Sequence, residues 1–242
     1  MIIKLNEVNI SEIKKHLKSD KIVVIKNQIN KNILSRLKIF LSSIGKNNFA
    51  EYHKIAIGCP NHFRINFEDK RSFVKGFFYQ FNFFPWNQDQ LDIFNLFGYI
   101  FKIKNQLNNL DQEKFFNPKK NNDCTIRFSV QFYPKGNGYL EEHSDPIDYH
   151  QKYLIQMVMS KKGKDFKKGG LFVQFNKKKI NIDNHVNIGD LVIFKANLNH
   201  GVEKIDPSTK PDLLNFKGRW MVLFATNKLI NNKKIKNSKK FI

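Results

Sequence analysis

The sequence has 242 residues, of which 41% are hydrophobic and 26% are charged, and its formal net charge is +21. These values exclude a disordered chain, because the hydrophobic fraction is enough to build a sizeable core. No apolar run approaches the ~18 residues of a membrane-spanning helix, so no such span is expected.

The positive charge has two interpretations. It can mark a protein that binds nucleic acid or an anionic membrane. Only five of the 42 basic residues are Arg, however, and Arg is the residue suited to bidentate contacts with guanine and phosphate. The Lys residues accompany heavy use of Asn, Ile and Phe, which is typical of AT-rich coding. The positive charge is therefore attributed to amino-acid composition in preference to a binding surface. A Lys-rich patch that binds an anionic partner stays open as the alternative.

A cytoplasmic location is expected. The N-terminal sequence MIIKLNEVNISEIKK lacks the charged, apolar and small-residue order of a signal peptide. Cys59 and Cys124 lie in no metal-binding or redox spacing, which indicates free thiols in a reducing compartment.

The first 70 residues are predicted to mix helices and strands. Residues 11–19 suit a short helix that Ser11 can cap. Residues 21–27, KIVVIKN, form a short apolar strand, and residues 31–45 have the periodicity of a helix that Gly45 ends.

The next region combines an aromatic block with a longer helix. Residues 72–86, SFVKGFFYQFNFFPW, are expected to supply mainly core side chains, with Tyr79, Asn82 and Trp86 as candidates for substrate contact. From Asn87 to about Leu107, apolar residues recur at three- and four-residue steps, which predicts a helix with a broad buried face.

From about Thr125 the sequence is typical of a β-protein. Short runs rich in Val, Ile, Phe and Tyr are separated by Gly, Asn, Asp and Pro, which favours a sandwich, barrel or jelly roll. The predicted strands are 125–133, 138–143, 152–159, 170–176, 191–195, 201–205 and 218–226. We expect a single domain over residues 1–242, with an N-terminal α/β layer (1–120), a jelly-roll core (121–228) and a frayed basic tail (229–242).

Four residues in this β-region form a candidate constellation. In YLEEHSDPIDYH, His143 and Asp145 lie two apart at the end of a strand and so point to the same side of the sheet. His200 follows another hydrophobic strand, and two imidazoles with one carboxylate are the ligand set of non-haem Fe(II) oxygenases. Arg219 begins a strand that is apolar on both faces, so it needs a buried anion from the protein or from a ligand.

Four segments, in this order, are similar to those of the 2-oxoglutarate/Fe(II) dioxygenases, particularly the prolyl-hydroxylase-like members. YPKGNGYLEEHSDP resembles the strand and turn that carry their H-x-D motif. KKGGLFVQF resembles their paired-glycine strand. GDLVIFKANLNHGVEKI resembles their segment with the second His, and GRWMVLF resembles their final strand with its basic residue. The resemblance covers residues 125–227.

The resemblance implies a double-stranded β-helix that holds Fe(II) through His143, Asp145 and His200. It also implies that Arg219 binds the distal carboxylate of 2-oxoglutarate. The interval from His200 to Arg219 is longer than the family spacing, and Lys210 lies at the commoner distance. Arg219 is preferred, because it begins a strand while Lys210 lies in a Pro-flanked loop. Three residues can supply the hydroxyl that assists the basic residue, namely Tyr133, Ser129 and Tyr153.

The implied activity is hydroxylation. Fe(II), 2-oxoglutarate and O₂ are the implied cofactors, with ascorbate as a candidate reductant, and the products from the cosubstrate are succinate and CO₂. The carboxylate of Asp145 favours hydroxylation over halogenation, while desaturation and demethylation stay open. The favoured substrate is a small molecule or a metabolite-linked group, such as an amino acid, sugar or acyl chain. The alternatives are a macromolecule, either a protein side chain or a methylated nucleic-acid base, and a non-catalytic jelly-roll binding module.

Other polar residues near the motif have two interpretations each. His150 and Asp148 can compete as metal ligands, but their position beyond Pro146 favours substrate contact or solvation. Glu141 and Glu142 are expected at the surface. Arg127 shares a strand face with Tyr133, so it can bind an anionic substrate group from inside the pocket or form a surface ion pair.

Overall fold

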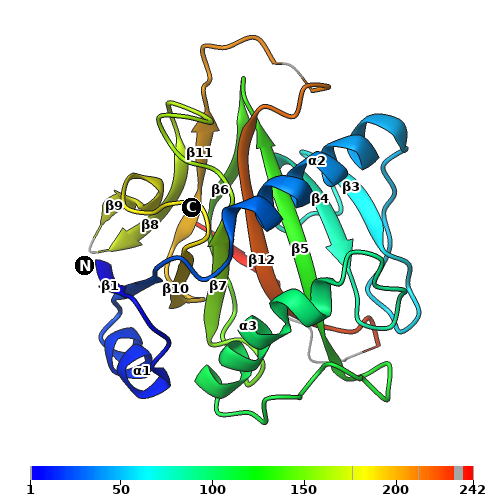
Figure 1. Ribbon diagram of the computed structural model, residues 1–242, viewed down its shortest axis with the longest axis vertical. Coiled ribbons are helices and arrows are strands. Elements are labelled where there is room, and N and C mark those ends of the chain that lie inside the picture. The colour runs from blue at the N-terminus through cyan, green and yellow to red at the C-terminus, as the bar shows by residue number, and fades with distance from the viewer. Residues whose placement is uncertain (1, 176, 212, 232–236, 242) are drawn as a thin grey trace.

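The strands after residue 120 alternate between two facing sheets. In the computed structural model, which describes residues 2–175, 177–211, 213–231 and 237–241, one sheet has the strand order β10-β7-β12-β5 and the other the order β6-β11-β8-β9. Except for the β8–β9 hairpin, these strands pair with partners that are not their neighbours in sequence, which is the arrangement of a double-stranded β-helix (Figure 1). These strands are β5 (Cys124–Pro134), β6 (Gly138–Ser144), β7 (Tyr153–Val158), β8 (Gly170–Phe175), β9 (Lys178–Asn181), β10 (Leu191–Lys195), β11 (His200–Ile205) and β12 (Gly218–Lys228).

The N-terminal strands extend this β-helix. β1 (Ile2–Leu5) and β2 (Ile22–Ile25) are added beside β10, and β3 (His62–Phe67) and β4 (Gly76–Phe83) are added beside β5. β4 pairs with both β5 and β6, so it joins the two sheets along one side. The predicted fold, a mainly β jelly-roll core with an N-terminal α/β layer, is confirmed.

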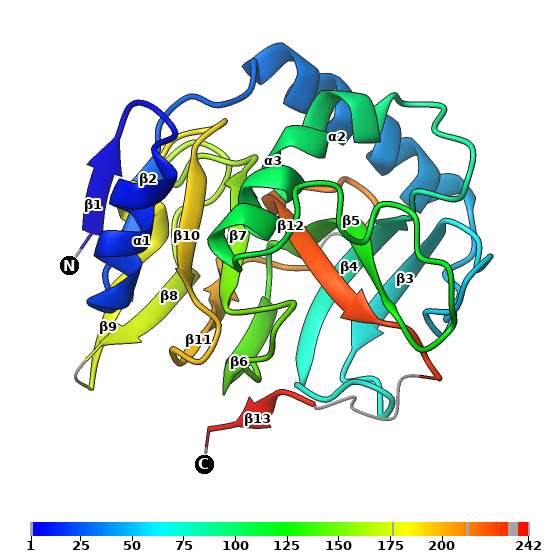
Figure 2. The same ribbon diagram turned by 90° about the horizontal axis from the view of Figure 1, so that it is seen from below.

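Two long helices cover the outer face of the β10-β7-β12-β5 sheet. They are α2 (Lys31–Asn47) and α3 (Ile93–Leu107), whereas α1 (Ile10–Lys18) lies beside β2 (Figure 2). A short 3₁₀ helix, η1 (Ile182–Asn184), follows β9.

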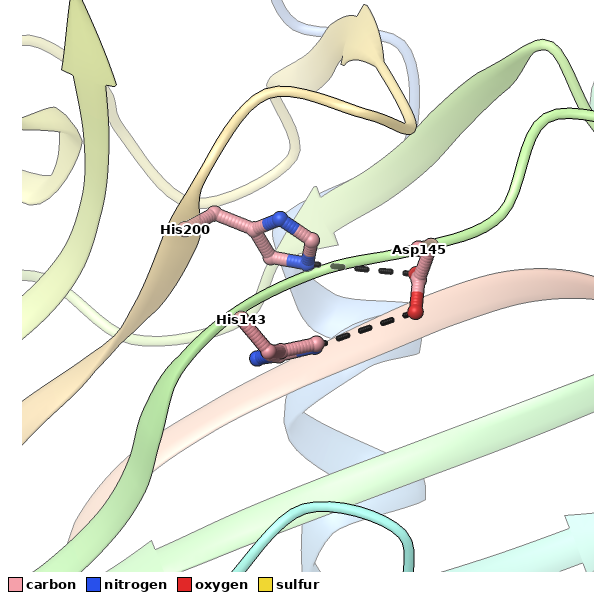
Figure 3. A group of neighbouring side chains, drawn as sticks. All are labelled: His143, Asp145 and His200. Atoms are coloured by element: carbon pink, nitrogen blue, oxygen red, sulfur yellow. Dashed lines mark ion pairs between the residues drawn. The ribbon is translucent and has the colours of Figure 1, made fainter. Parts of the chain in front are cut away.

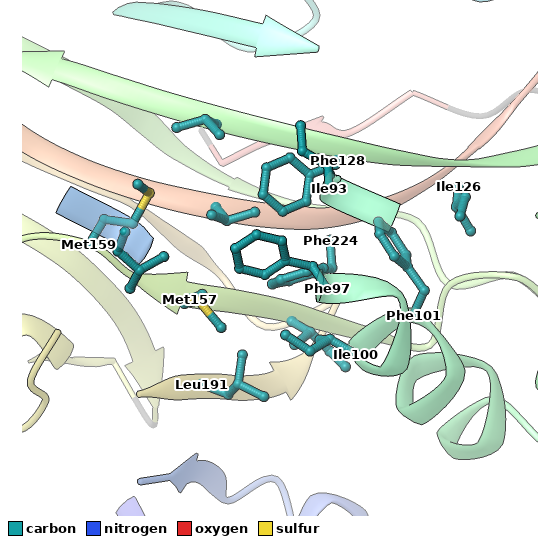
Figure 4. Close-up of a cluster of buried hydrophobic side chains, with 14 of the residues drawn as sticks. Ile93, Phe97, Ile100, Phe101, Ile126, Phe128, Met157, Met159, Leu191 and Phe224 are labelled. Carbon is teal, nitrogen blue, oxygen red and sulfur yellow. The ribbon is translucent and has the colours of Figure 1, made fainter. Parts of the chain in front are cut away.

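The main core lies between α3 and the sheet. The ring centroid of Phe97 is 4.9 Å from that of Phe128 on β5, and that of Phe101 is 5.2 Å from that of Phe224 on β12 (Figure 4). Side chains alternate along a strand, so the residues that directly precede and follow Phe128 on β5 and Phe224 on β12 point to the opposite face of the sheet. That opposite face is the interior of the β-helix, and it carries the polar residues of β5.

The seven predicted strands match β5, β6, β7, β8, β10, β11 and β12 within two residues at each end. Residue 176, the last of the predicted strand 170–176, lies outside the described residues. Five strands were not predicted, namely β1, β3, β4, β9 and β13 (Lys239–Lys240).

Three predicted ends were wrong. Helix α1 is capped by Asn9, whose Oδ1 accepts the backbone N–H of Glu12, so Ser11 lies inside the helix. Helix α2 continues two residues past Gly45. That glycine is required by packing, since a Cβ there would lie 2.2 Å from Cζ of Phe216. Helix α3 begins only at Ile93, because the carboxylate of Asp89 accepts the N–H groups of Ile93 and Phe94.

The C-terminal tail also differs from the expectation of a frayed segment. Within the described residues 237–241, strand β13 pairs antiparallel with β6, placing Lys239 opposite Ser144 and Lys240 opposite His143. An ion pair of 2.8 Å between Lys240 Nζ and Glu141 Oε2 lies at the same edge. The predicted tail residues 232–236 and 242 lie outside the described residues.

Candidate metal and cosubstrate site

Two adjacent strands bring the predicted triad together. His143 on β6 and His200 on β11 are directly opposite in the antiparallel register, and their ring centroids are 4.3 Å apart. Asp145 follows His143 by two residues and returns to the same side. Its carboxylate oxygens lie 3.8 Å from Nε2 of His143 and 3.9 Å from Nε2 of His200 (Figure 3). One potential ligand atom from each residue thus lies within 4.8 Å of the others.

Backbone carbonyls fix the tautomers of both imidazoles. Nδ1 of His143 lies 2.8 Å from the carbonyl of Glu141, and Nδ1 of His200 lies 2.8 Å from the carbonyl of Leu198. A carbonyl can only accept, so each Nδ1 carries the proton and each Nε2 presents its lone pair. The Nε2 lone pairs of His143 and His200 therefore both lie on the side of the imidazoles that faces the carboxylate of Asp145.

The surroundings also keep His200 neutral. Burial lowers the pKa of its imidazole to about 4, and the neighbouring His143 lowers it further, against a smaller opposite effect of Asp145. A neutral imidazole with Nε2 free and an adjacent carboxylate are the donors that a divalent iron binds. The three residues thus fit a 2-His-1-carboxylate metal site in donor type, imidazole tautomer and proximity.

The triad faces a cavity of about 560 Å³ inside the β-helix. The inner faces of β5 and β12 line its wall, together with residues of the 52–55 segment and Asn237 and Ser238 from the tail. The hydroxyl of Ser238 donates to Oδ1 of Asp145. No sequence pattern predicts this contact, because the tail is polar and weakly patterned.

Arg219 lies deep at the beginning of β12, where it is 2% exposed. The buried anion expected for it is Asp183 of η1: Nε of Arg219 donates to Oδ2 at 2.7 Å and Nη2 donates to Oδ1 at 3.3 Å. Nη1 is buried without a hydrogen-bond partner among the described residues. Nη1 is therefore an unused donor, but Arg219 itself is not among the residues that line the cavity. Lys210 is exposed in the loop between β11 and β12.

Of the three predicted assisting hydroxyls, that of Tyr133 is the one whose residue lines the cavity. Its ring lies 5.7 Å from the guanidinium carbon of Arg219, and its hydroxyl donates to Oε1 of Gln131 at 2.7 Å. Burial raises the pKa of this phenol, so it stays protonated as a donor. Ser129 instead donates to Asn82, and Tyr153 packs in the main core.

The other predicted site residues divide between cavity and core. His150 and Asp148 line the cavity, but they are not part of the triad cluster, and Asp148 pairs with Lys228. Tyr79, Asn82 and Trp86 do not line the cavity. Ion pairs with lysines hold Glu141 and Glu142 at the rim of β6.

No protein-family model and no curated protein matches the sequence. Solved structures do match in fold. A prolyl-4-hydroxylase from Pseudomonas putida aligns with a TM-score of 0.55 at 10% identity, covering 89% of this chain and 96% of that one. A prolyl hydroxylase from Trichoplax adhaerens, in complex with a hypoxia-inducible-factor peptide fragment, aligns with a TM-score of 0.52 at 10% identity, covering 91% and 88%. JOX2 in complex with 2OG, Fe and JA aligns with a TM-score of 0.50 at 14% identity, covering 96% and 75%.

These matches extend over nearly the whole chain, so the β-helix and its N-terminal layer are shared together. None of the helices in the described residues is long and apolar enough to cross a membrane. The chain therefore has the fold of the prolyl hydroxylases and 2-oxoglutarate–Fe(II) oxygenases, the family that its motifs resemble.

Proposed function

We propose that this protein is an Fe(II)- and 2-oxoglutarate-dependent oxygenase that hydroxylates an unactivated C–H bond of its substrate. The observation that carries the proposal is the triad itself. His143, Asp145 and His200 converge on one point, and both imidazoles are held in the tautomer that presents Nε2 to it. A site that served only structure would have no need of three metal-binding groups facing a cavity.

The side chains of the triad would hold Fe(II) on one face and leave its other positions open to the cavity. Bound there, the metal would supply the redox chemistry that couples conversion of 2-oxoglutarate and O₂ to succinate and CO₂ with substrate oxidation. The carbonyls of Glu141 and Leu198 orient the two imidazoles. Ser238 donates to Asp145, which leaves the other carboxylate oxygen free to bind.

Arg219 would bind the distal carboxylate of 2-oxoglutarate through Nη1. Nη1 is a buried donor without a partner in the described residues. It lies where β12 begins and β5 ends, and the ring of Tyr133 lies beside the guanidinium. Asp183 offsets part of the guanidinium charge and fixes its plane, so the donor is positioned before the cosubstrate arrives.

The substrate is proposed to be a small molecule or a metabolite-linked group. A cavity of about 560 Å³ is in the range of small-molecule sites. The structural neighbours include one hydroxylase bound to a peptide and one protein bound to JA, so a protein side chain is the alternative that the fold equally accommodates.

An anaerobic titration with Fe(II) and 2-oxoglutarate tests the proposal, following the visible metal-to-ligand charge-transfer band. We expect a band in the wild type, no band in His143→Ala, and a band that needs far more 2-oxoglutarate in Arg219→Lys. Lys210→Ala is the matched control, and its titration should overlay that of the wild type. Absence of the band from folded wild-type protein would refute the oxygenase and favour a non-catalytic binding module.

A further inference from the structure

Arg127 lies on the inner face of β5 and lines the same cavity as the triad. Its cross-strand neighbour on β12 is Ala225, whose small side chain leaves room for the guanidinium. Residues 127, 129, 131 and 133 share this face by alternation, and three of them, Arg127, Gln131 and Tyr133, line the cavity.

This guanidinium has no protein partner in the described residues. Neither an ion pair nor a hydrogen bond of its side chain is present there, and Nε is buried without an acceptor. The contrast with other arginines is direct. Arg64 has Asp69 at 3.9 Å, and Arg219 has Asp183 at 2.7 Å. A buried charge without a partner is costly, so its retention in a cavity indicates a ligand that supplies the partner.

The charges around Arg127 favour an anion. Burial, followed by the nearby positive charge of Arg64, lowers its pKa to about 10, a value at which it still carries its charge at neutral pH. Lys54 lines the same cavity and adds positive charge. The two carboxylates in the cavity lining are already engaged, since Asp148 pairs with Lys228 and Asp145 accepts from Ser238.

Arg127 is too far from Arg219 to share one cosubstrate with it. Arg219 is opposite Tyr133 in the β5–β12 register, six residues along the strand from Arg127. Six residues of extended strand span roughly 20 Å. This spacing separates the two Cα atoms, and Asp183 holds the guanidinium of Arg219 at its own end of the strand. A five-carbon diacid bound to Arg219 is therefore not expected to reach Arg127.

One further polar side chain on the inner face of β12 lies beside Arg127. Asn227 lines the cavity two residues from Ala225, and its Oδ1 is buried without a partner in the described chain. By alternation, Asn227 shares the inner face with Ala225, and its side-chain carbonyl can accept from a hydroxyl or amine of the ligand.

We propose that Arg127 binds a carboxylate or phosphate group of the substrate and so orients the substrate's other end toward the triad. The orienting role of Arg127 rests on the proposed oxygenase function. Binding of the anion by Arg127 requires neither metal nor 2-oxoglutarate.

The small number of arginines makes a direct test practical. The chain has five, so a ¹H–¹⁵N spectrum of the Arg Nε–H groups contains five signals, each assignable by a single Arg→Lys variant. The full chain without added metal is titrated with phenylacetate, with phenyl phosphate and with neutral phenylacetamide. We expect one or both anions to shift the Arg127 signal saturably, the more effective anion identifying the group, and phenylacetamide to leave it unchanged.

Affinity measurements on variants complete the test. Arg127→Gln should weaken binding of the effective anion about tenfold or more, as expected for loss of a charge-assisted hydrogen bond. Arg36→Gln removes the same charge from an exposed position of α2 and should leave the affinity unchanged. The proposal is overturned if neither anion moves the Arg127 signal, or if Arg127→Gln weakens 2-oxoglutarate binding as much as Arg219→Lys does. Failure of the charge-transfer titration alone would refute the oxygenase and leave the anion site standing.

Discussion

The guanidinium of Arg219 lies against the carboxylate of Asp183, with Nε 2.7 Å from Oδ2, and each of the two residues is 2% exposed. The same carboxylate oxygen accepts the backbone N–H of Leu171 at 2.6 Å. This pair therefore ties β12, η1 and β8 together directly behind the proposed cosubstrate anchor.

Breaking this pair should destabilise the protein strongly. Asp183→Ala leaves a buried guanidinium and a backbone N–H without their acceptor, so we expect a loss of about 3–5 kcal/mol in the free energy of unfolding. The measurement is urea unfolding followed by far-UV circular dichroism. The double variant Arg219→Met/Asp183→Leu should recover the part of the loss that comes from the unpaired guanidinium, whereas the N–H of Leu171 still lacks its acceptor. A single-variant loss below about 1 kcal/mol would mean that the pair is solvated, as at a surface.

Gly170 should control the position of Asp183. A Cβ at Gly170 would lie 2.4 Å from Oδ2 of Asp183, and the residue has φ of +115°. Gly170→Ala is expected to displace the carboxylate and with it Arg219, so 2-oxoglutarate affinity should fall while metal affinity is retained. Gly163→Ala is the matched control, because Gly163 also has a positive φ, +90°, but has nothing within 4 Å of the added Cβ. Equal effects of the two substitutions on 2-oxoglutarate affinity would refute the coupling.

Mild acid should destabilise the fold partly through His150. Burial, followed by the positive charges of Lys104 and Lys228 and against the opposite effect of Asp148, lowers the pKa of His150 to about 4. The pKa of this imidazole in the unfolded chain is near 6.5, so between pH 6.5 and about pH 4 the unfolded state binds a proton that the folded state does not bind.

Stability should therefore fall as the pH drops from 6.5 toward 4, and His150 should contribute at most about 2 kcal/mol by pH 5. Urea midpoints of the wild type and His150→Gln, measured from pH 7.5 to pH 5, check this contribution. We expect a flatter profile for the variant. Parallel profiles would show that His150 is protonated in the folded protein.

The buried lysine of α3 should make stability depend on pH in the same direction, but in a higher pH window. Lys104 Nζ donates to the carbonyl of Phe224 at 2.7 Å, and burial lowers its pKa to about 7, against a smaller opposite effect of Asp145. Between about pH 7 and pH 10.5 the unfolded state binds the proton and the folded state does not, so stability rises with pH. Lys104→Met should remove this rise and increase stability at pH 7 by about 1 kcal/mol or more. Thermal unfolding at pH 7 and pH 9 provides the comparison, and a variant that is less stable at both would contradict it.

Sequence patterns determined much of this protein. Alternation along single strands placed Arg127, Tyr133 and Arg219 on inner faces and Phe128 and Phe224 against α3, because the two-residue period of a strand is a local property. The order of the four family-like segments predicted the double-stranded β-helix. The ends of α1, α2 and α3 were less predictable, since a capping Asn9, a packing contact of Gly45 and a capping Asp89 compete with the simple periodicity.

Only the tertiary structure decided which partners each charged side chain has. Asp183 meets Arg219 from 36 residues away, Ser238 meets Asp145 from 93 residues away, and Arg127 meets no carboxylate at all in the described chain. Such pairing depends on which strands lie side by side, which is set by long-range closure of the two sheets and leaves no local pattern in the sequence. For the same reason, the sequence suggested His143, Asp145 and His200 as a group, while the antiparallel register of β6 and β11 brought their side chains together around one point.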